Sequence, residues 1–225
     1  MKNLPDLLKK NPVFAMLKPG ELQELVRLGS KRSYQKGEKV ILYGDVWPYI
    51  FLVGNGLIEG MKESGDGRIL RVASFGVGEL FWGLAFFHEN APMPVTLEVR
   101  EDSQLYLWSR DSIFPLLVNN GWATWELSRL MAGRMQGASD LLDGLAFRPV
   151  AGRLARFLLD NFEVAGDLAI SRNLTLDEMA ARIGSTREMV CRALYGFSDK
   201  KLIEVTRTEF VLTDRAGLAQ LVERG

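Results

Sequence analysis

The spacing of apolar residues changes abruptly near residue 109, and this change limits what the chain can fold into. Between residues 30 and 110 the apolar residues form short runs, separated by glycines at positions 37, 44, 56, 67 and 78. Short strands at regular intervals are typical of an antiparallel roll or barrel. From residue 109 onward the apolar spacing is helical. We therefore expect an α+β fold in which an antiparallel β-roll precedes a helical region.

The same reasoning places the individual strands and the first helices. Strand-like runs lie at residues 40–42, 50–53, 57–58, 69–75, 95–99 and 105–108. Residues 65–67, Gly-Asp-Gly, predict a hairpin turn, because glycine tolerates positive φ. Residues 1–29 predict short helices, with a break at Pro19 and Gly20 before a helix over residues 21–29.

The longest predicted helix covers residues 122–147, a stretch without proline. Apolar residues recur along its second half at alternating spacings of four and three, which is the pattern of a coiled-coil seam. The seam consists of Met131, Met135, Ala138, Leu142 and Leu145. Two interpretations remain open, a parallel coiled coil with a second copy and packing onto the chain's own core. Pro149 ends this helix and begins the next one.

Residues 174–203 carry the most specific pattern in the chain. Thr175 and Glu178 form a capping box that starts one helix, and Gly184 ends it. Ser185 or Thr186 caps a second helix, whose apolar residues recur at spacings of four and three. Two short helices joined by a tight turn predict a helix-turn-helix, whose second helix enters the major groove of DNA. A hairpin formed by residues 203–206 and 210–212 would be its wing.

Three charged residues on the second helix are suited to reading base pairs. Arg187, Glu188 and Arg192 lie on its exposed face, within its first two turns. Arginine can donate two hydrogen bonds to guanine, and a carboxylate can accept one from the amino group of cytosine. We therefore predict that these three residues contact bases. A solvated, salt-bridged helix face is the alternative interpretation.

Six further polar or basic residues in this region are predicted to contact the DNA backbone. They are Thr175, Ser185, Thr186, Lys200, Lys201 and Arg207. Contacts to phosphates position a protein on the duplex without specifying its sequence. Ordinary surface charge is the alternative for the basic residues among them.

The composition excludes several classes of protein. With one cysteine, Cys191, and one histidine, His88, the chain lacks an internal disulfide, a cysteine-only metal site and the histidines that a cupin-like enzyme needs. We predict no catalytic residues and no metal site. The 28 basic residues balance 28 acidic ones, so DNA would be recognised by a local surface. The apolar stretch at residues 80–87 is too short to span a bilayer and the amino terminus lacks a signal peptide, so we expect a cytoplasmic protein without membrane contact.

Short motifs in both halves of the chain point to one known family. Residues 184–192 read Gly-Ser-Thr-Arg-Glu-Met-Val-Cys-Arg, within the predicted helix-turn-helix. Residues 30–108 contain Lys36-Gly37-Glu38, Tyr43-Gly44-Asp45, Asp66-Gly67-Arg68 and Gly78-Glu79-Leu80. On these residues the chain resembles the Crp/Fnr transcription regulators, in their recognition helix and in the order of the glycines of their cyclic-nucleotide-binding roll. The resemblance covers nearly the whole chain.

The resemblance implies three segments, an effector domain at residues 1–118, a dimerisation helix at residues 119–147 and a winged helix-turn-helix at residues 148–225. It implies a homodimer that binds double-stranded DNA at a palindrome of TGTGA-like half-sites, with RNA polymerase as a further partner. It also implies allosteric control by a small-molecule effector. The residues expected in the effector pocket are Gly78, Glu79, Leu80 and His88 of the roll, with Ala138 and Ser139 of the long helix.

The sequence departs from the family at the position where cyclic AMP is bound. Members that respond to cyclic AMP have an Arg-Ser or Arg-Thr pair downstream of Gly-Glu-Leu, and here Met93 and Pro94 stand in its place. A buried phosphodiester without a cation is unfavourable, so we predict that cyclic AMP binds weakly or not at all. The iron–sulfur mechanism is excluded, because the amino-terminal region has no cysteines. Two alternatives are a haem-dependent gas or redox sensor that uses His88, and a cyclic-nucleotide-binding module that acts on protein partners.

Overall fold

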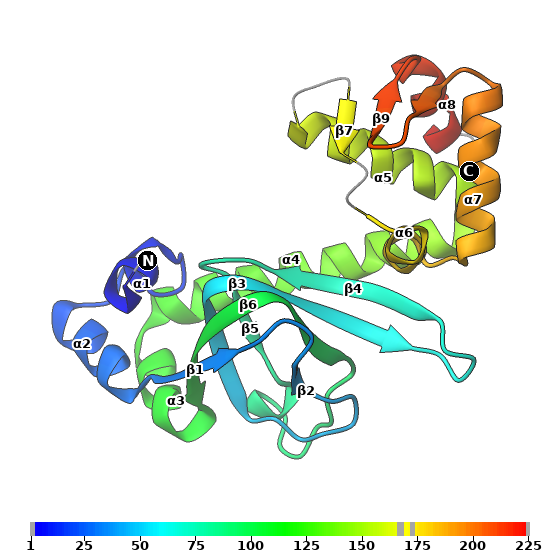
Figure 1. Ribbon diagram of the computed structural model, residues 1–225. Helices are drawn as coiled ribbons and strands as arrows, with labels where there is room; N and C mark the ends of the chain where they lie inside the picture. Colours follow the sequence, from blue (N-terminus) through cyan, green and yellow to red (C-terminus); the bar gives the residue numbers. More distant parts are fainter. Residues whose placement is uncertain (1–2, 166–168, 172–173, 224–225) are drawn as a thin grey trace. The chain divides into compact units, whose positions relative to one another are not determined.

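The computed structural model describes residues 3–165, 169–171 and 174–223. The chain forms two compact units, one made of residues 1–62 and 72–136 and the other of residues 63–71 and 137–225. Figure 1 shows the helices α1–α3 beside the strands β1–β6, and the helices α5–α8 with the strands β7–β9. The long helix α4 (Gly121–Phe147) contributes residues to both units.

The first unit is built on a six-stranded sheet that forms a roll (Figure 1). Its strands are β1 (Ser30–Tyr34), β2 (Lys39–Ile41), β3 (Tyr49–Glu63), β4 (Ile69–Phe75), β5 (Leu80–Trp82) and β6 (Thr96–Ser109). The strand order is β1-β6-β3-β4, and in addition β2 pairs with β6 and β5 with β3. The predicted hairpin turn joins β3 to β4, where Gly67 has a φ of +79°. The expected antiparallel roll is confirmed.

Strands β3 and β6 are longer than the sequence predicts. Residues 50–53 and 57–58 both belong to β3, and residues 95–99 and 105–108 both belong to β6. The register between the two strands shifts three times between Val53 and Ile58, so β3 bends at its glycines without ending. The sequence does not predict β1, because Ser-Lys-Arg-Ser-Tyr is polar and its pairing with β6 is a long-range contact.

Two apolar clusters stabilise the first unit. One packs α1 (Leu4–Lys10), α2 (Pro19–Leu28), α3 (Arg110–Asn119) and the start of α4 against the roll. Within it, Trp108 Nε1 donates a hydrogen bond of 2.7 Å to the Leu25 carbonyl. The second cluster lies inside the roll and includes the rings of Trp47, Phe51 and Phe75. The break predicted at Pro19 and Gly20 is wrong, because proline is favourable in a first helical turn and α2 begins with it.

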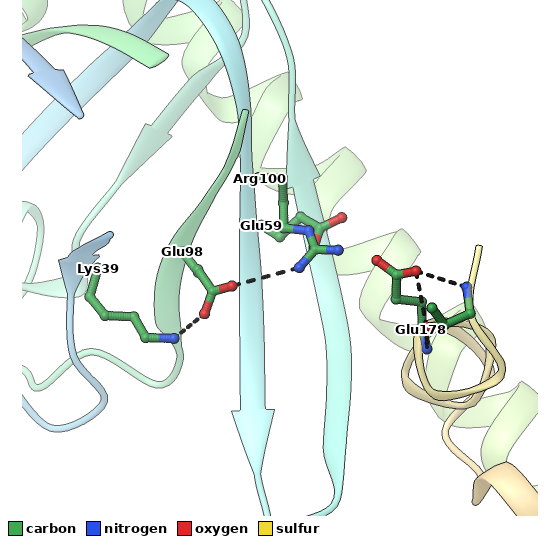
Figure 2. Close-up of polar contacts among 6 residues, drawn as sticks. Lys39, Glu59, Glu98, Arg100 and Glu178 are labelled. Carbon is green, nitrogen blue, oxygen red and sulfur yellow. Dashed lines mark hydrogen bonds and ion pairs between the residues drawn. The ribbon is translucent and has the colours of Figure 1, made fainter. Parts of the chain in front are cut away.

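Four charged side chains connect three strands of the roll (Figure 2). Lys39 on β2 pairs with Glu98 on β6. Arg100, also on β6, lies 3.6 Å from Glu98 and 3.1 Å from Glu59 on β3. Each charge in this group lies next to an opposite charge on a neighbouring strand or on β6 itself, so the ion pairs hold β2, β6 and β3 together.

The long helix α4 is uninterrupted, as predicted. Asn120 caps it by accepting a hydrogen bond from the backbone of Ala123 at 3.0 Å. Ala123, Glu126 and Leu127 are its buried residues, and all three lie in its first two turns. The remaining turns of α4 therefore have little cover from the chain's own core. No helix within the described ranges is both long and apolar enough to cross a bilayer.

The second unit combines helices with a small antiparallel sheet. After α4 its elements are α5 (Val150–Ala165), β7 (Ala169–Ser171), α6 (Leu176–Ile183), α7 (Arg187–Asp199), β8 (Ile203–Val205), β9 (Glu209–Leu212) and α8 (Arg215–Glu223). The predicted wing is the hairpin of β8 and β9, and β7 pairs with its other edge. The inner faces of α6 and α7 are buried, with Met179, Ala180 and Ile183 on one and Val190, Leu194 and Phe197, at spacings of four and three, on the other. The expected helix-turn-helix with a wing is confirmed.

Candidate nucleic-acid interface

The first helix of the helix-turn-helix begins at a complete capping box. Thr175 Oγ1 accepts a hydrogen bond from the Glu178 backbone at 3.1 Å, and Glu178 Oε2 accepts one from the Thr175 backbone at 2.9 Å. Figure 2 shows Glu178 at the start of α6. The box satisfies backbone donors that an uncapped helix leaves free, and so it fixes the residue at which α6 begins.

The turn between α6 and α7 depends on one glycine and one threonine. Gly184 has a φ of +62° and a ψ of +50°, a left-handed conformation that favours glycine. Thr186 Oγ1 accepts a hydrogen bond from the Met189 backbone at 3.3 Å and caps α7. Of the two residues predicted as the cap, the structure uses Thr186. Ser185 donates its backbone N–H to the Ala180 carbonyl at 2.9 Å.

The three residues predicted to contact bases lie together on the exposed side of α7. The exposed fractions of the Arg187, Glu188 and Arg192 side chains are 68%, 79% and 68%. Arg192 Nη2 donates a hydrogen bond of 2.8 Å to Glu188 Oε1. Arg187 Nη1 lies 3.4 Å from Oδ2 of Asp177, which is on α6. No local sequence pattern singles out Asp177, because its contact with Arg187 joins two helices.

The residues predicted to contact phosphates lie at three places in the second unit. Thr175, Ser185 and Thr186 precede α6 and α7, Lys200 and Lys201 follow α7, and Arg207 lies in the loop of the wing. Ser185 is half-buried and the other five are exposed. Backbone N–H groups at a helix start attract anions, and exposed basic side chains do the same.

Arg153 on α5 holds the turn of the helix-turn-helix, a role that no local sequence pattern indicates. Its Nε donates to the Ile183 carbonyl at 2.8 Å and its Nη2 to the Gly184 carbonyl at 3.2 Å. Its Nη1 donates to the Arg148 carbonyl at 2.8 Å, beyond the end of α4. Burial lowers the pKa of Arg153 from its ordinary value, and an arginine in a protein keeps its charge. A single cation therefore binds the carbonyl groups at the ends of two helices.

The first unit contains a hollow of about 530 Å³ beside the start of α4. It is lined by Asn11, Pro12 and Val13 of the loop after α1, by Gly78, Glu79 and Leu80, and by Glu126, Arg129, Leu130, Gly133 and Arg134 of α4. Glu79 Oε2 accepts the Gly76 backbone N–H at 2.7 Å, and its other oxygen lies 3.6 Å from Arg134 Nη2. The Arg134 guanidinium also lies 4.6 Å from the centre of the Phe75 ring. The volume of the hollow is in the range of small-molecule sites.

The hollow contains half of the residues expected in the effector pocket. Gly78, Glu79 and Leu80 line it. His88, Ala138 and Ser139 do not line it, and all three are exposed. The α4 residues at the hollow lie closer to the start of the helix, where α4 packs on the roll. Among the described residues no cluster of three or more histidine, cysteine, aspartate or glutamate residues is placed to hold a metal ion.

The predicted seam of α4 is largely uncovered in the single chain. The exposed fractions of Met131, Met135 and Leu142 are 40%, 73% and 66%. Ala138 is exposed, and Leu145 is half-buried next to Gly184. Trp122 and Trp125, which the seam does not include, are also exposed, by 49% and 61%.

Two family models match this chain. Residues 31–120 match a cyclic nucleotide-binding domain, and residues 152–221 match a Crp-like helix-turn-helix domain. The chain belongs to the Crp/Fnr family. The chain is therefore a transcription regulator of the Crp/Fnr type, with an effector-binding domain and a DNA-binding helix-turn-helix.

Its relatives include other Crp/Fnr regulators of similar length. The chain is 22% identical to the CRP-like cAMP-activated global transcriptional regulator of Mycobacterium tuberculosis, over 96% of this chain and 99% of the relative. It is 27% identical to the cyclic AMP receptor protein of Thermus thermophilus, over 88% of this chain and 90% of the relative. Among solved structures, the c-di-GMP-responsive regulator CLP of Xanthomonas campestris has a TM-score of 0.76 at 22% identity, covering 87% of this chain and 99% of that one. A Crp/Fnr regulator from Eubacterium rectale has a TM-score of 0.75 at 20% identity, covering 94% and 98%.

The position at which an arginine is expected in members that respond to cyclic AMP is apolar in this Crp/Fnr protein. Met93, at the position of the expected arginine, is 1% exposed, and its backbone pairs with Gly44 and Asp45 at 2.9 and 2.8 Å. The apolar cluster around it includes Phe51, whose ring centre lies 5.6 Å from those of Trp47 and Phe81. Met93, Phe51, Trp47 and Phe81 supply no cation to compensate a phosphodiester for its lost hydration.

Proposed function

We propose that this protein is a homodimeric, sequence-specific DNA-binding regulator, not an enzyme, and that it acts in the cytoplasm. The observation that carries the proposal is the exposure of Arg187, Glu188 and Arg192 on the first two turns of a helix whose opposite face is buried. This is the geometry of a recognition helix in the major groove. The arginines suit guanine and the glutamate suits cytosine, as in a TGTGA-like half-site.

The dimer in this proposal forms along α4. Met131, Met135, Ala138, Leu142 and Leu145 supply a heptad seam, in which Met135 and Leu142, 73% and 66% exposed, lie one heptad apart. A second copy of α4 would cover this apolar face as a parallel coiled coil. Residues 1–118 would then be the effector domain, residues 119–147 the dimerisation helix and residues 148–225 the DNA-binding domain. Two recognition helices related by a two-fold axis require half-sites about 34 Å apart.

Contacts to the DNA backbone would hold each recognition helix in place. We assign them to Thr175, Ser185, Thr186, Lys200, Lys201 and Arg207, of which all but Ser185 are exposed. RNA polymerase is the partner through which a bound dimer would act on transcription.

Fluorescence anisotropy on labelled duplexes tests the proposal directly. The protein is expected to prefer a palindrome of TGTGA-like half-sites over a scrambled duplex by about 1,000-fold or more. Arg192→Ala is expected to weaken operator binding by about 1–3 kcal/mol and to relax selectivity at one base pair, because it removes a bidentate contact. Equal affinity for both duplexes would contradict the proposal and would favour a module that acts on protein partners.

The effector site in this proposal is the hollow at Gly78, Glu79 and Leu80. Its walls are apolar at Pro12, Val13, Leu80 and Leu130, and Glu79, Glu126, Arg129 and Arg134 bring charges. A ligand there would touch both the roll and α4, so it would change operator affinity if it bound two packings of α4 unequally. Such a ligand has an apolar body and a polar group, and it is not cyclic AMP. The haem alternative loses support, because His88 is exposed and does not line the hollow.

The expected response to cyclic AMP is none. Cyclic AMP at 1 mM should give no binding heat by isothermal titration calorimetry and should leave operator affinity unchanged, because the buried Met93 stands where an arginine would bind the phosphate. Native mass spectrometry of the freshly purified dimer would show whether it carries a different small molecule. A dissociation constant for cyclic AMP in the micromolar range would overturn this part of the proposal.

A further inference from the structure

Asp177 connects the two helices of the helix-turn-helix at the reading face. It is the second residue of α6, and its Oδ2 lies 3.4 Å from Nη1 of Arg187, the first residue of α7. Both side chains are 68% exposed. An ion pair this exposed contributes little to folding stability. Its consequence therefore lies in what the surface presents to DNA.

The four charged residues Asp177, Arg187, Glu188 and Arg192, here called the reading face, carry no net charge together. Arg187 is paired with Asp177, and Arg192 is paired with Glu188 at 2.8 Å. Two cations and two anions thus meet the DNA together. A DNA phosphate that approaches either arginine comes close to the carboxylate already paired with it. Repulsion between the phosphate and the carboxylate weakens these phosphate contacts, which do not depend on the DNA sequence.

The contact with Asp177 also leaves one edge of Arg187 available. A guanidinium has five N–H donors in a fixed planar arrangement. The carboxylate occupies Nη1, so the edge formed by Nε and Nη2 remains. Two parallel donors on that edge match the O6 and N7 acceptors of guanine. A carboxylate behind the guanidinium thereby restricts the rotation of Arg187 while leaving its base-reading edge exposed.

We propose that Asp177 is a specificity-determining positioning residue, which holds Arg187 for guanine and lowers the affinity of the protein for random DNA. The inference rests on the proposed function and deepens it. It assigns to α6, the helix in front of the recognition helix, a residue that acts on sequence discrimination through Arg187.

The experiment uses the full-length protein and its own operator, defined as the duplex that the native protein selects most strongly from a random library. Affinities for this operator and for a random duplex are measured by anisotropy at several salt concentrations. Asp177→Asn removes the charge at nearly constant volume. It is expected to raise affinity for random DNA about 5-fold and to lower the ratio of operator to random affinity about 10-fold. Asp177→Glu keeps the charge and is expected to retain the ratio within about 3-fold.

Two controls separate this role from a general effect of charge. Asp160→Asn removes another exposed carboxylate, 56% exposed, that pairs with Arg156 at 3.0 Å within α5, and it is expected to leave the ratio unchanged. In an Arg187→Ala background, Asp177→Asn is expected to change the ratio less than about 2-fold, because the residue through which Asp177 acts is gone.

The outcomes distinguish the inference from the function on which it rests. If the native protein discriminates its operator but Asp177→Asn matches Asp160→Asn, the inference is wrong and the proposed function stands. The inference is also wrong if the effect of Asp177→Asn persists in the Arg187→Ala background. If the native protein does not discriminate any duplex, both the inference and the proposed function are overturned.

Discussion

Replacing Met135 and Leu142 together with aspartate is expected to give a folded monomer that binds its operator about 100-fold more weakly than the native protein. The two side chains are 73% and 66% exposed in the single chain, so their replacement removes no intrachain core contact. In the proposed dimer they face their counterparts, where four buried carboxylates would repel one another. A monomer engages one half-site and loses the gain from simultaneous binding of both. Sedimentation velocity and operator anisotropy measure the two effects.

A matched control keeps the seam apolar. Exchanging the two residues, Met135→Leu with Leu142→Met, conserves volume and hydrophobicity, and it is expected to retain both the dimer and operator affinity. Loss of folding in the aspartate variant would appear as lost helical circular dichroism. If the aspartate variant remains dimeric, the seam of α4 is not the dimer interface, and the helix has a different partner.

Arg153→Ala is expected to destabilise the second unit by about 2–3 kcal/mol. The variant leaves the carbonyl groups of Ile183 and Gly184 without their donor, at the point where α6 ends and the turn to α7 begins. A hydrogen bond from a charged donor to a part-buried carbonyl is among the stronger ones in proteins. Faster hydrogen exchange in peptides from α6 and α7, and a lower urea midpoint, are the expected measurements. Operator affinity should fall as well, since the orientation of α7 depends on this turn.

The control for Arg153 is its neighbour Arg156. Arg156 pairs with Asp160 on the surface of α5, at 3.0 Å, and both side chains are more than half exposed. Arg156→Ala is therefore expected to change stability by less than about 0.5 kcal/mol. Equal effects of the two substitutions would mean that the carbonyl contacts of Arg153 contribute nothing beyond an exposed charge.

The helix-turn-helix is the part of the fold that its own sequence predicts best. The capping box of Thr175 and Glu178, the left-handed Gly184 and the spacing of Val190, Leu194 and Phe197 each act within a few residues. Local interactions of this kind are readable from a short window. The exposure of Arg187, Glu188 and Arg192 follows from the same helical period.

The roll is predicted less well, because its strands depend on distant partners. β1 is polar and forms only because residues of β6 pair with it, and β3 continues through glycines because bulges let it bend. The effector pocket shows the same limit. Gly78, Glu79 and Leu80 line the hollow, but the helix residues opposite them are set by the packing of α4 on the roll.

The sequence by itself determined the α+β class, the long helix, the helix-turn-helix and the three residues that face DNA in the proposal. Each of these depends on hydrophobic periodicity, capping or motif spacing, which are properties of neighbouring residues. The tertiary structure alone decided that Arg153 holds the turn, that Asp177 pairs with Arg187 and that Met93, which stands in place of an expected arginine, is buried. These depend on side chains from separate elements meeting in space, and no local pattern records which elements will meet.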